Sequence, residues 1–233
     1  MREIVLDTET TGLDPAAGHR IVEIGAVELI NHVPSGRTFH VYVNPEREVP
    51  AEACAVHGLS TEFLRDHPCF SAVAEDFESF ILGDKLIIHN APFDLGFLNA
   101  ELARLGRAGL DPQRVTCTLT LARQKHAMAP NSLDALCKRY GIDSTRRSKH
   151  GALLDAELLA GVYLELIGGR QTSLTLAGGA ETAENAAVQA VGTRRTRPQP
   201  LTPRLSEDED RAHAALVASL GEAALWTRWL SSG

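Results

Sequence analysis

Long apolar runs are absent from this sequence, because no stretch approaches the roughly 20 apolar residues that a membrane-spanning helix requires. The start, Met1-Arg2-Glu3, also lacks the basic region and apolar segment of a secretion signal. These absences argue against a membrane protein and against an exported one. We therefore expect a cytoplasmic protein without a membrane partner.

Cysteine is scarce, with 4 residues among 233, and no Cys-x-x-Cys pair occurs. A disulfide framework or a structural zinc site is therefore not indicated. Cys54 and His57 have a ligand-like spacing, but no second pair accompanies them. In a reducing compartment we expect the cysteines to be small buried apolar residues.

Positive charge is in deficit, since 23 Lys and Arg face 30 Asp and Glu and the formal net charge is −7. That balance excludes a general nucleic-acid coat protein. An acidic enzyme can still bind nucleic acid where metal ions and a local basic cluster supply the charge. Such a cluster is present and consists of Lys138, Arg139, Arg146, Arg147 and Lys149.

Two carboxylates follow a short apolar run at the start of the chain. Residues 4–6 read as a buried strand, and alternate residues of a strand share a side, so Asp7 and Glu9 should project together. Paired carboxylates in a half-buried place are unfavourable unless a cation lies between them, and hard oxygen ligands favour Mg²⁺ or Mn²⁺. The alternative is a solvated acidic turn.

Further strands and helices are predicted along residues 20–166. Segments 20–30 and 38–43 should form a hairpin around a turn at 31–36, and 85–89 and 115–117 read as two more strands. Helices are predicted at 50–56, 70–82, from 91, at 132–140 and from 150. Together these elements indicate an α/β protein with a mixed five-stranded sheet flanked by helices.

Two predicted helices carry an acid on their apolar stripe. Asp94 shares its face with Phe97, Leu98, Leu102 and Leu105, and Asp155 shares its face with Leu158, Leu159, Val162 and Leu166. A single acid in a first helical turn can be explained by the helix dipole. Two such acids, added to the strand pair, suggest four carboxylates that converge on one site.

Three motifs occur in order along the chain. They are Asp7-Thr8-Glu9-Thr10-Thr11-Gly12, His89-Asn90-Ala91-Pro92-Phe93-Asp94 and His150-x₄-Asp155. Together they resemble the exonuclease motifs of the DEDDh superfamily of 3′→5′ exonucleases, which implies a ribonuclease-H-like core. The resemblance extends over essentially the whole chain to one family within it, the epsilon proofreading subunits of bacterial DNA polymerase III.

The resemblance implies roles for individual residues. Asp7 would bridge two divalent ions, Mg²⁺ or Mn²⁺, while Glu9 and Asp155 complete the first site and Asp94 holds the second. His150 would be the general base; without its motif it would read as a surface residue. Expected substrate-binding residues are Thr10, Thr11, Gly12, Leu13, His57, His89, Asn90 and Phe93.

The C-terminal part has a different composition from the domain expected at 1–169. Residues 177–203 contain few large aliphatic side chains, so we expect a flexible linker. Residues 170–176 resemble the sliding-clamp-binding peptide of the family, through Gln171, Leu174 and Leu176. The alternative is the frayed end of the core.

A last segment, 204–233, should bind the polymerase (alpha) subunit. Ser206 and Glu209 form a capping box before a short helix. No core is available to this segment, so its large apolar side chains suggest docking to a protein. The residues concerned are Leu216, Leu220, Trp226 and Trp229.

The expected function is proofreading, in which mismatched 3′-terminal nucleotides leave single-stranded or frayed DNA ends as 5′-monophosphates. The partners implied are the DNA, the alpha subunit, the beta clamp and a small third core subunit. A ribonuclease of the same superfamily would share every catalytic residue, and a free-standing exonuclease would have no use for residues 204–230. A non-catalytic adaptor is disfavoured because no carboxylate of the set is missing.

Overall fold

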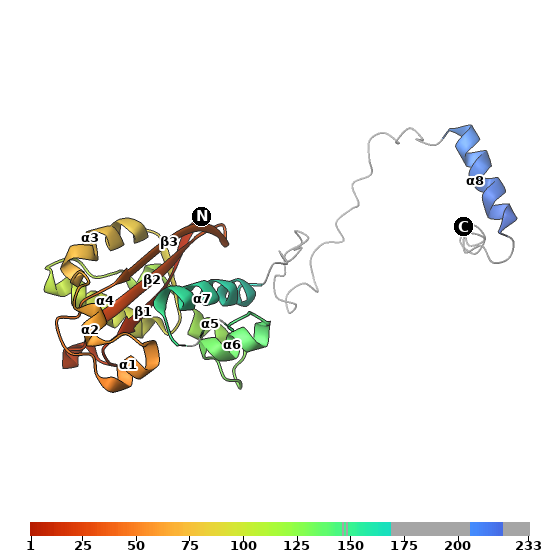
Figure 1. Ribbon diagram of the computed structural model, residues 1–233. Helices are drawn as coiled ribbons and strands as arrows, with labels where there is room; N and C mark the ends of the chain where they lie inside the picture. The colour runs from red at the N-terminus through yellow and green to blue at the C-terminus, as the bar shows by residue number, and fades with distance from the viewer. Residues whose placement is uncertain (146, 148, 169–205, 221–233) are drawn as a thin grey trace, which may run out of the picture. The chain divides into compact units, whose positions relative to one another are not determined.

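The computed structural model describes residues 1–145, 147, 149–168 and 206–220 (Figure 1). The chain divides into two compact units, Met1–Leu176 and Ala177–Gly233. In the described residues no helix is both long and apolar enough to cross a membrane.

The first unit is built on a five-stranded mixed sheet, as predicted. Its strands are β1 (Arg2–Thr10), β2 (Ile21–Ile30), β3 (Val33–Tyr42), β4 (Lys85–Ile88) and β5 (Val115–Cys117). They lie in the order β3-β2-β1-β4-β5, with β1 antiparallel to β2 and parallel to β4. The central strand β1 therefore lies between a hairpin partner and a strand reached through a crossover.

The hairpin turn is shorter than predicted. Only Asn31 and His32 connect β2 to β3, and both adopt left-handed backbone angles, with φ of 50° and 67°. These angles suit a two-residue hairpin turn. Pro34 and Gly36, taken for turn residues, lie within β3, which is an edge strand and can tolerate a proline.

Helices cover both faces of the sheet (Figure 1). They are α1 (Ala51–His57), α2 (Thr61–Leu64), α3 (Phe70–Ile81), α4 (Ala91–Arg104), α5 (Thr118–Lys125), α6 (Leu133–Tyr140) and α7 (Ala152–Leu166), and 3₁₀ turns occur at Pro15–Ala17 and Pro112–Arg114. The predictions missed α2 and α5. The buried stripe predicted for α4 is wrong at Leu105, which is 37% exposed because the helix ends one residue earlier.

The strand alternation divides the core into two layers. Ile4 and Leu6 of β1 pack with α3 and α4 on one face, while Val5 packs with α5, α6 and α7 on the other. Of the cysteines, only Cys137 is fully buried and the other three are half-buried, so the prediction for them was only partly right.

Helix α7 lies against the sheet with almost no clearance at Gly25 of β2. A Cβ atom at Gly25 would lie 2.2 Å from the carbonyl carbon of Ala152, at the start of α7. Gly25 is also the partner of Asp7 in the β1–β2 ladder. The absence of a side chain at Gly25 therefore lets the start of α7 come close to the strand position of Asp7.

The second unit contains one described helix, α8 (Glu207–Ser219). The predicted capping box is confirmed, since the Ser206 amide donates to Oε2 of Glu209 at 2.8 Å and the Glu209 amide donates to Oγ of Ser206 at 3.3 Å. Leu216 and Leu220 are 59% and 53% exposed. Gln171, Leu174, Leu176, Trp226 and Trp229 lie outside the described residues.

Candidate active site

The structure brings together the acids that the sequence singled out. Asp7 and Glu9 come from β1, Asp94 from the first turn of α4 and Asp155 from the first turn of α7. All four line one cavity of about 860 Å³, together with His150. Asp94 and Asp155 are each only 3% exposed. Asp7 is half-buried and Glu9 buried, and both lie within strand β1 and not on a solvated turn.

Asp94 is anchored by a residue that the sequence reasoning did not single out. The amide of Thr8 donates to Oδ1 of Asp94 at 3.1 Å, and the Thr8 hydroxyl donates to the same oxygen at 2.7 Å. Thr8 can do this because it points from β1 toward α4, opposite to its neighbours in the strand. Its place between two acids in the first motif was the only available signal.

Burial makes the ionised form of these acids costly. It is the main cause that raises the pKa of Asp7 well above its ordinary value, with the neighbouring Asp94 and Glu9 adding to the effect. Burial also raises the pKa of Glu9 to about 8 and that of Asp94 to about 7, the latter against hydrogen bonds from Thr8. A cation placed among the acids would reverse this balance.

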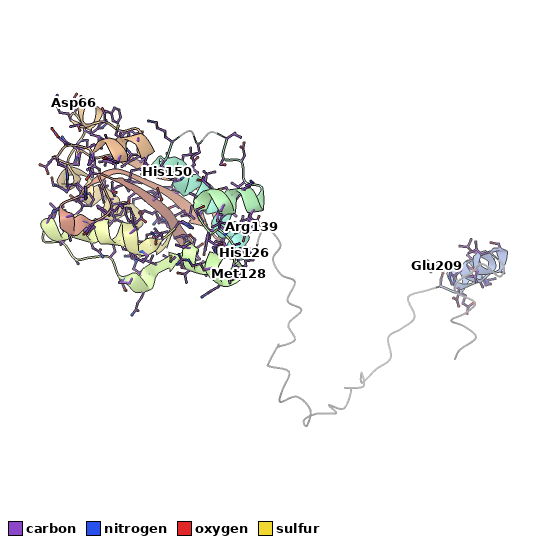
Figure 2. All side chains as sticks on the ribbon, turned by 90° about the horizontal axis from the view of Figure 1, so that it is seen from below. Asp66, His126, Met128, Arg139, His150 and Glu209 are labelled. Carbon is purple, nitrogen blue, oxygen red and sulfur yellow. The ribbon has the colours of Figure 1, made fainter. Side chains whose placement is uncertain are left out.

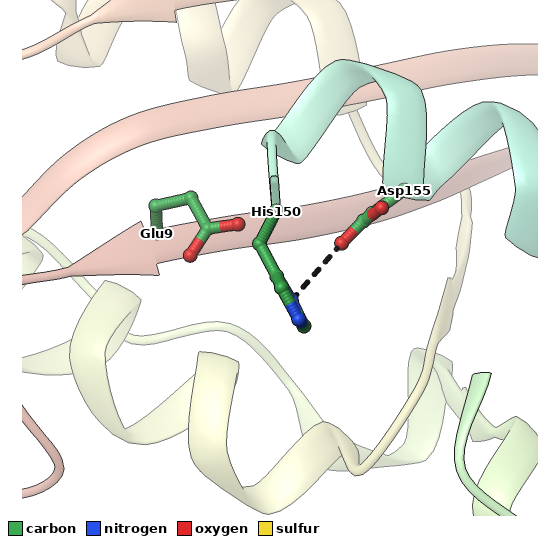
Figure 3. Close-up of side chains that lie close together, drawn as sticks. All are labelled: Glu9, His150 and Asp155. Carbon is green, nitrogen blue, oxygen red and sulfur yellow. Dashed lines mark ion pairs between the residues drawn. The ribbon is translucent and has the colours of Figure 1, made fainter. Parts of the chain in front are cut away.

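The donors present fit a divalent cation. Glu9, His150 and Asp155 can each offer a ligand atom within 4.8 Å of the others (Figure 3). Oxygen-rich sets of this kind suit Mg²⁺ or Mn²⁺. Within the described residues, Cys54 and His57 belong to no group of three or more such donors, which gives the zinc alternative no support.

His150 lies at the mouth of the cavity. Its side chain is 48% exposed, its Nδ1 atom is 3.5 Å from Oδ2 of Asp155, and Figure 2 labels it on the first unit. The residue precedes α7, and its amide donates to the carbonyl of Val56 at 3.2 Å. An imidazole held at this edge can reach both solvent and the carboxylates.

Arg147 is a member of the site that the motifs did not indicate. Its Nε and Nη2 atoms lie 2.5 and 2.6 Å from the two oxygens of Asp155. The sequence placed it in a basic cluster, but it gave no sign that one member contacts one of the four acids.

The expected substrate residues fall into two adjoining cavities. His89, Asn90 and Phe93 line the cavity of the acids. The second cavity, of about 560 Å³, is lined by Thr10, Thr11, Gly12, Leu13 and His57, and it shares Glu9 and Phe93 with the first. Sequence reasoning missed Val56 and His19, which also line it.

The sequence also matches known proteins over most of its length. The exonuclease family RNase_T matches residues 4–163. A DNA polymerase III subunit epsilon of Rickettsia felis is 48% identical, covering 94% of this chain and 97% of that protein, and one of Escherichia coli (strain K12) is 44% identical, covering 97% of each.

Solved structures give the same fold. Exonuclease X in complex with 5′ overhanging duplex DNA is 26% identical, with a TM-score of 0.56 over 71% of this chain and 90% of that one. The nuclease domain of 3'hExo, a DEDDh family member, is 20% identical, with a TM-score of 0.60 over 71% of this chain and 91% of that one.

Proposed function

Because this chain belongs to the exonuclease family of DNA polymerase III epsilon subunits, we propose that it removes mismatched 3′-terminal nucleotides as 5′-monophosphates with two divalent cations. The observation that carries the proposal is the convergence of three buried carboxylates, the half-buried carboxylate of Asp7 and one half-exposed histidine on a single cavity. Such a set suits metal-assisted hydrolysis of a phosphodiester.

Each residue of the acidic cavity has its own proposed role. Asp7, Glu9 and Asp155 would hold one cation, and Asp94 would hold the second with Asp7. Bound Mg²⁺ or Mn²⁺ supplies positive charge that offsets the developing charge on the scissile phosphate. Thr8 keeps Asp94 oriented through its two hydrogen bonds. His150 accepts a proton from the attacking water as the new P–O bond forms and the bond to the 3′ oxygen breaks.

The second cavity is proposed to receive the terminal nucleotide. Leu13, Val56 and Phe93 give it an apolar surface beside the acids. An apolar surface can contact any of the four bases, which a proofreading enzyme needs. A mismatched end frays at lower cost than a paired end, so it enters the cavity more often without base-specific contacts.

The C-terminal unit is proposed to hold the enzyme on the cytoplasmic replication machinery. Leu216 of α8 and Leu220, which follows the helix, are exposed, so that a partner such as the alpha subunit can cover them. Residues 170–176 are proposed to contact the beta clamp, and a small third core subunit remains part of the proposal. Anchoring the far end of a linker would raise the local concentration of nuclease at the primer end.

The test is a parallel digestion of three substrates by the purified chain with Mg²⁺: 3′-mismatched DNA, matched DNA and RNA of the same sequence. We expect nucleoside 5′-monophosphates, released fastest from the mismatched DNA. Asp7→Ala should abolish release while keeping the fold, because it removes the acid shared by both proposed cations. Faster digestion of the RNA would favour the ribonuclease alternative, and inactivity of the parent would favour the adaptor.

A further inference from the structure

The side chain of Arg147 donates hydrogen bonds to both carboxylate oxygens of Asp155. Nε lies 2.5 Å from Oδ1 and Nη2 lies 2.6 Å from Oδ2, so the guanidinium and the carboxylate form a bidentate ion pair. The contact is shielded from water, since the two side chains are only 7% and 4% exposed. Bidentate pairs of this kind are among the strongest hydrogen-bonded contacts in proteins.

The same guanidinium reaches His150. Its Nη2 atom lies 2.9 Å from Nδ1 of the ring. Because a guanidinium has only donors, Nδ1 must accept, and a neutral ring then carries its proton on Nε2. In this arrangement neither nitrogen of His150 has a free lone pair with which to take a proton from water.

A third contact fixes the guanidinium from the other side. Nη1 of Arg147 donates to Oδ1 of Asp134, in the first turn of α6. The Asp134 side chain is 68% exposed, so it lies at the surface and outside the buried set of acids. Arg147 therefore links α6 to the first turn of α7.

The contact with Asp155 occupies a carboxylate that the proposed cation needs. Of the donor group Glu9, His150 and Asp155, two members are held by Arg147. A divalent cation drawn to Asp155 would lie against a guanidinium that is also positively charged, and the repulsion between the two is large at such distances. Arg147 and the cation are thus competitors for one carboxylate.

We propose that Arg147 is a latch: it neutralises Asp155 and caps His150 while the site is free of metal, and it moves away when a divalent cation binds. This inference rests on the cation site of the proposed function. Arg147 is a positioning residue in this scheme, since it acts on the acid and the histidine and not on the substrate. The latch lowers cation affinity and stabilises the metal-free fold.

The test measures Mn²⁺ binding by isothermal titration calorimetry with the full chain, freed of metal and without DNA. Arg147→Gln should bind Mn²⁺ about tenfold more tightly than the parent, the equivalent of about 1.4 kcal/mol. Arg147→Lys keeps the charge but cannot form the bidentate pair with Asp155, so this variant should also bind Mn²⁺ more tightly than the parent. The matched control is Arg139→Gln on α6, whose side chain holds Pro130 and Asn131 and should leave the affinity unchanged (Figure 2). Unchanged or weaker binding by both Arg147 variants would overturn the latch.

Asp134→Asn separates the latch from simple charge effects. Loss of a nearby negative charge should by itself weaken cation binding, whereas loss of an anchor of the latch should tighten it, by about twofold to fivefold. Because Asp134 is exposed, this variant also decides the matter if the Arg147 variants do not fold. Weaker Mn²⁺ binding by Asp134→Asn counts against the latch. A parent that binds no Mn²⁺ would instead refute the cation site itself.

Discussion

Without metal, the first unit should lose stability as the pH rises from 7 to 9. Burial raises the pKa of Glu9 from 4.5 to about 8, so the folded protein keeps a proton at pH 7 that the unfolded chain has already released. A raised pKa of this kind stabilises the fold at low pH, and the contribution disappears as the pH rises through the pKa of the group in the folded protein. For Glu9 the loss between pH 7 and pH 9 is about 1 kcal/mol.

Other groups also contribute to stability in and around this window. Burial would raise the pKa of the Cys117 thiol, but hydrogen bonds, first among them one with Thr120, lower it below its ordinary value, so this thiol acts in the opposite direction to Glu9. The raised pKa values of Asp7 and Asp94 act in the same direction as that of Glu9. Burial lowers the pKa of His57 and of His89, and these shifts make stability increase with pH. They act only at pH values below the ordinary histidine pKa of about 6.5, outside the window from pH 7 to 9.

The assay is urea unfolding of the full chain at 25 °C in a chelator, followed by circular dichroism at pH 7, 8 and 9. The matched control is Glu9→Gln, which keeps the shape of the side chain but cannot titrate, so its decline with pH should be smaller by about 1 kcal/mol. Saturating Mg²⁺ should reverse the trend in the parent, because bound carboxylates must be ionised. Equal pH slopes in the parent and in Glu9→Gln would refute the reasoning from burial.

Three further outcomes are expected. His150→Ala should lower the rate of nucleotide release by about 10² to 10⁴ while Mn²⁺ binding persists in a titration, as for loss of a general base; an equal loss of metal affinity would make it a ligand instead. Gly25→Ala should cost about 1 to 3 kcal/mol in urea unfolding, because its Cβ would collide with Ala152 and displace α7; an unchanged midpoint would contradict the tight contact. Trp226→Ala with Trp229→Ala should abolish complex formation with the polymerase subunit in size-exclusion chromatography and leave nuclease activity intact, since aromatic anchors typically contribute about 2 kcal/mol or more each; a retained complex would place the interface on the first unit.

The elements that could be predicted from the sequence are those with a strong period or a clear cap. Helix α6 begins after Ser132 and ends at Gly141, which has a left-handed φ of 66°, as its cap residues indicated. Asp94 and Asp155 could be placed near the core because each shares a helical stripe with apolar residues. A buried acid needs a cation or a hydrogen-bond donor beside it, and this requirement marks the site in the sequence itself.

Short or polar elements could not be predicted in the same way. Helix α2 (Thr61–Leu64) is a single turn and has no period to detect, although Ser60 caps it. The β2–β3 turn was predicted too long because Pro34 and Gly36 are common turn residues, while only Asn31 and His32 connect the two strands. Local sequence preferences favoured a longer turn, and pairing with β2 extended the strand over these residues.

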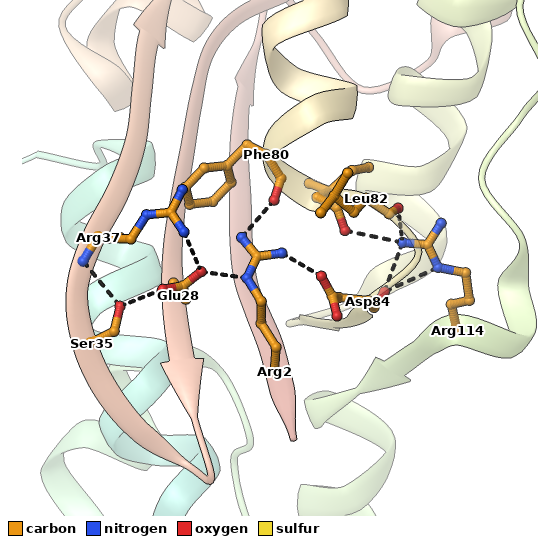
Figure 4. Close-up of polar contacts among 9 residues, drawn as sticks. Arg2, Glu28, Ser35, Arg37, Phe80, Leu82, Asp84 and Arg114 are labelled. Atoms are coloured by element: carbon orange, nitrogen blue, oxygen red, sulfur yellow. Dashed lines mark hydrogen bonds and ion pairs between the residues drawn. The ribbon is translucent and has the colours of Figure 1, made fainter.

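Contacts made by long charged side chains could not be predicted from the sequence either. Arg2 donates to Glu28, to Asp84 and to the carbonyl of Phe80, residues from two separate parts of the chain (Figure 4). An arginine has several rotatable bonds and five donors, so its partners depend on which elements the fold brings near. The same limitation hid Arg147 and its hold on Asp155.

The close contact between Gly25 and the start of α7 has a consequence for the protein while it is being made. Asp7, Glu9 and Asp94 leave the ribosome well before Asp155, which completes the set only when α7 settles over Gly25. A nascent chain that ends before α7 carries the earlier acids but lacks one wall of their cavity. Products of interrupted translation should therefore be inert toward nucleic acid, and hydrolytic capacity should arise late, in a single step, as α7 docks.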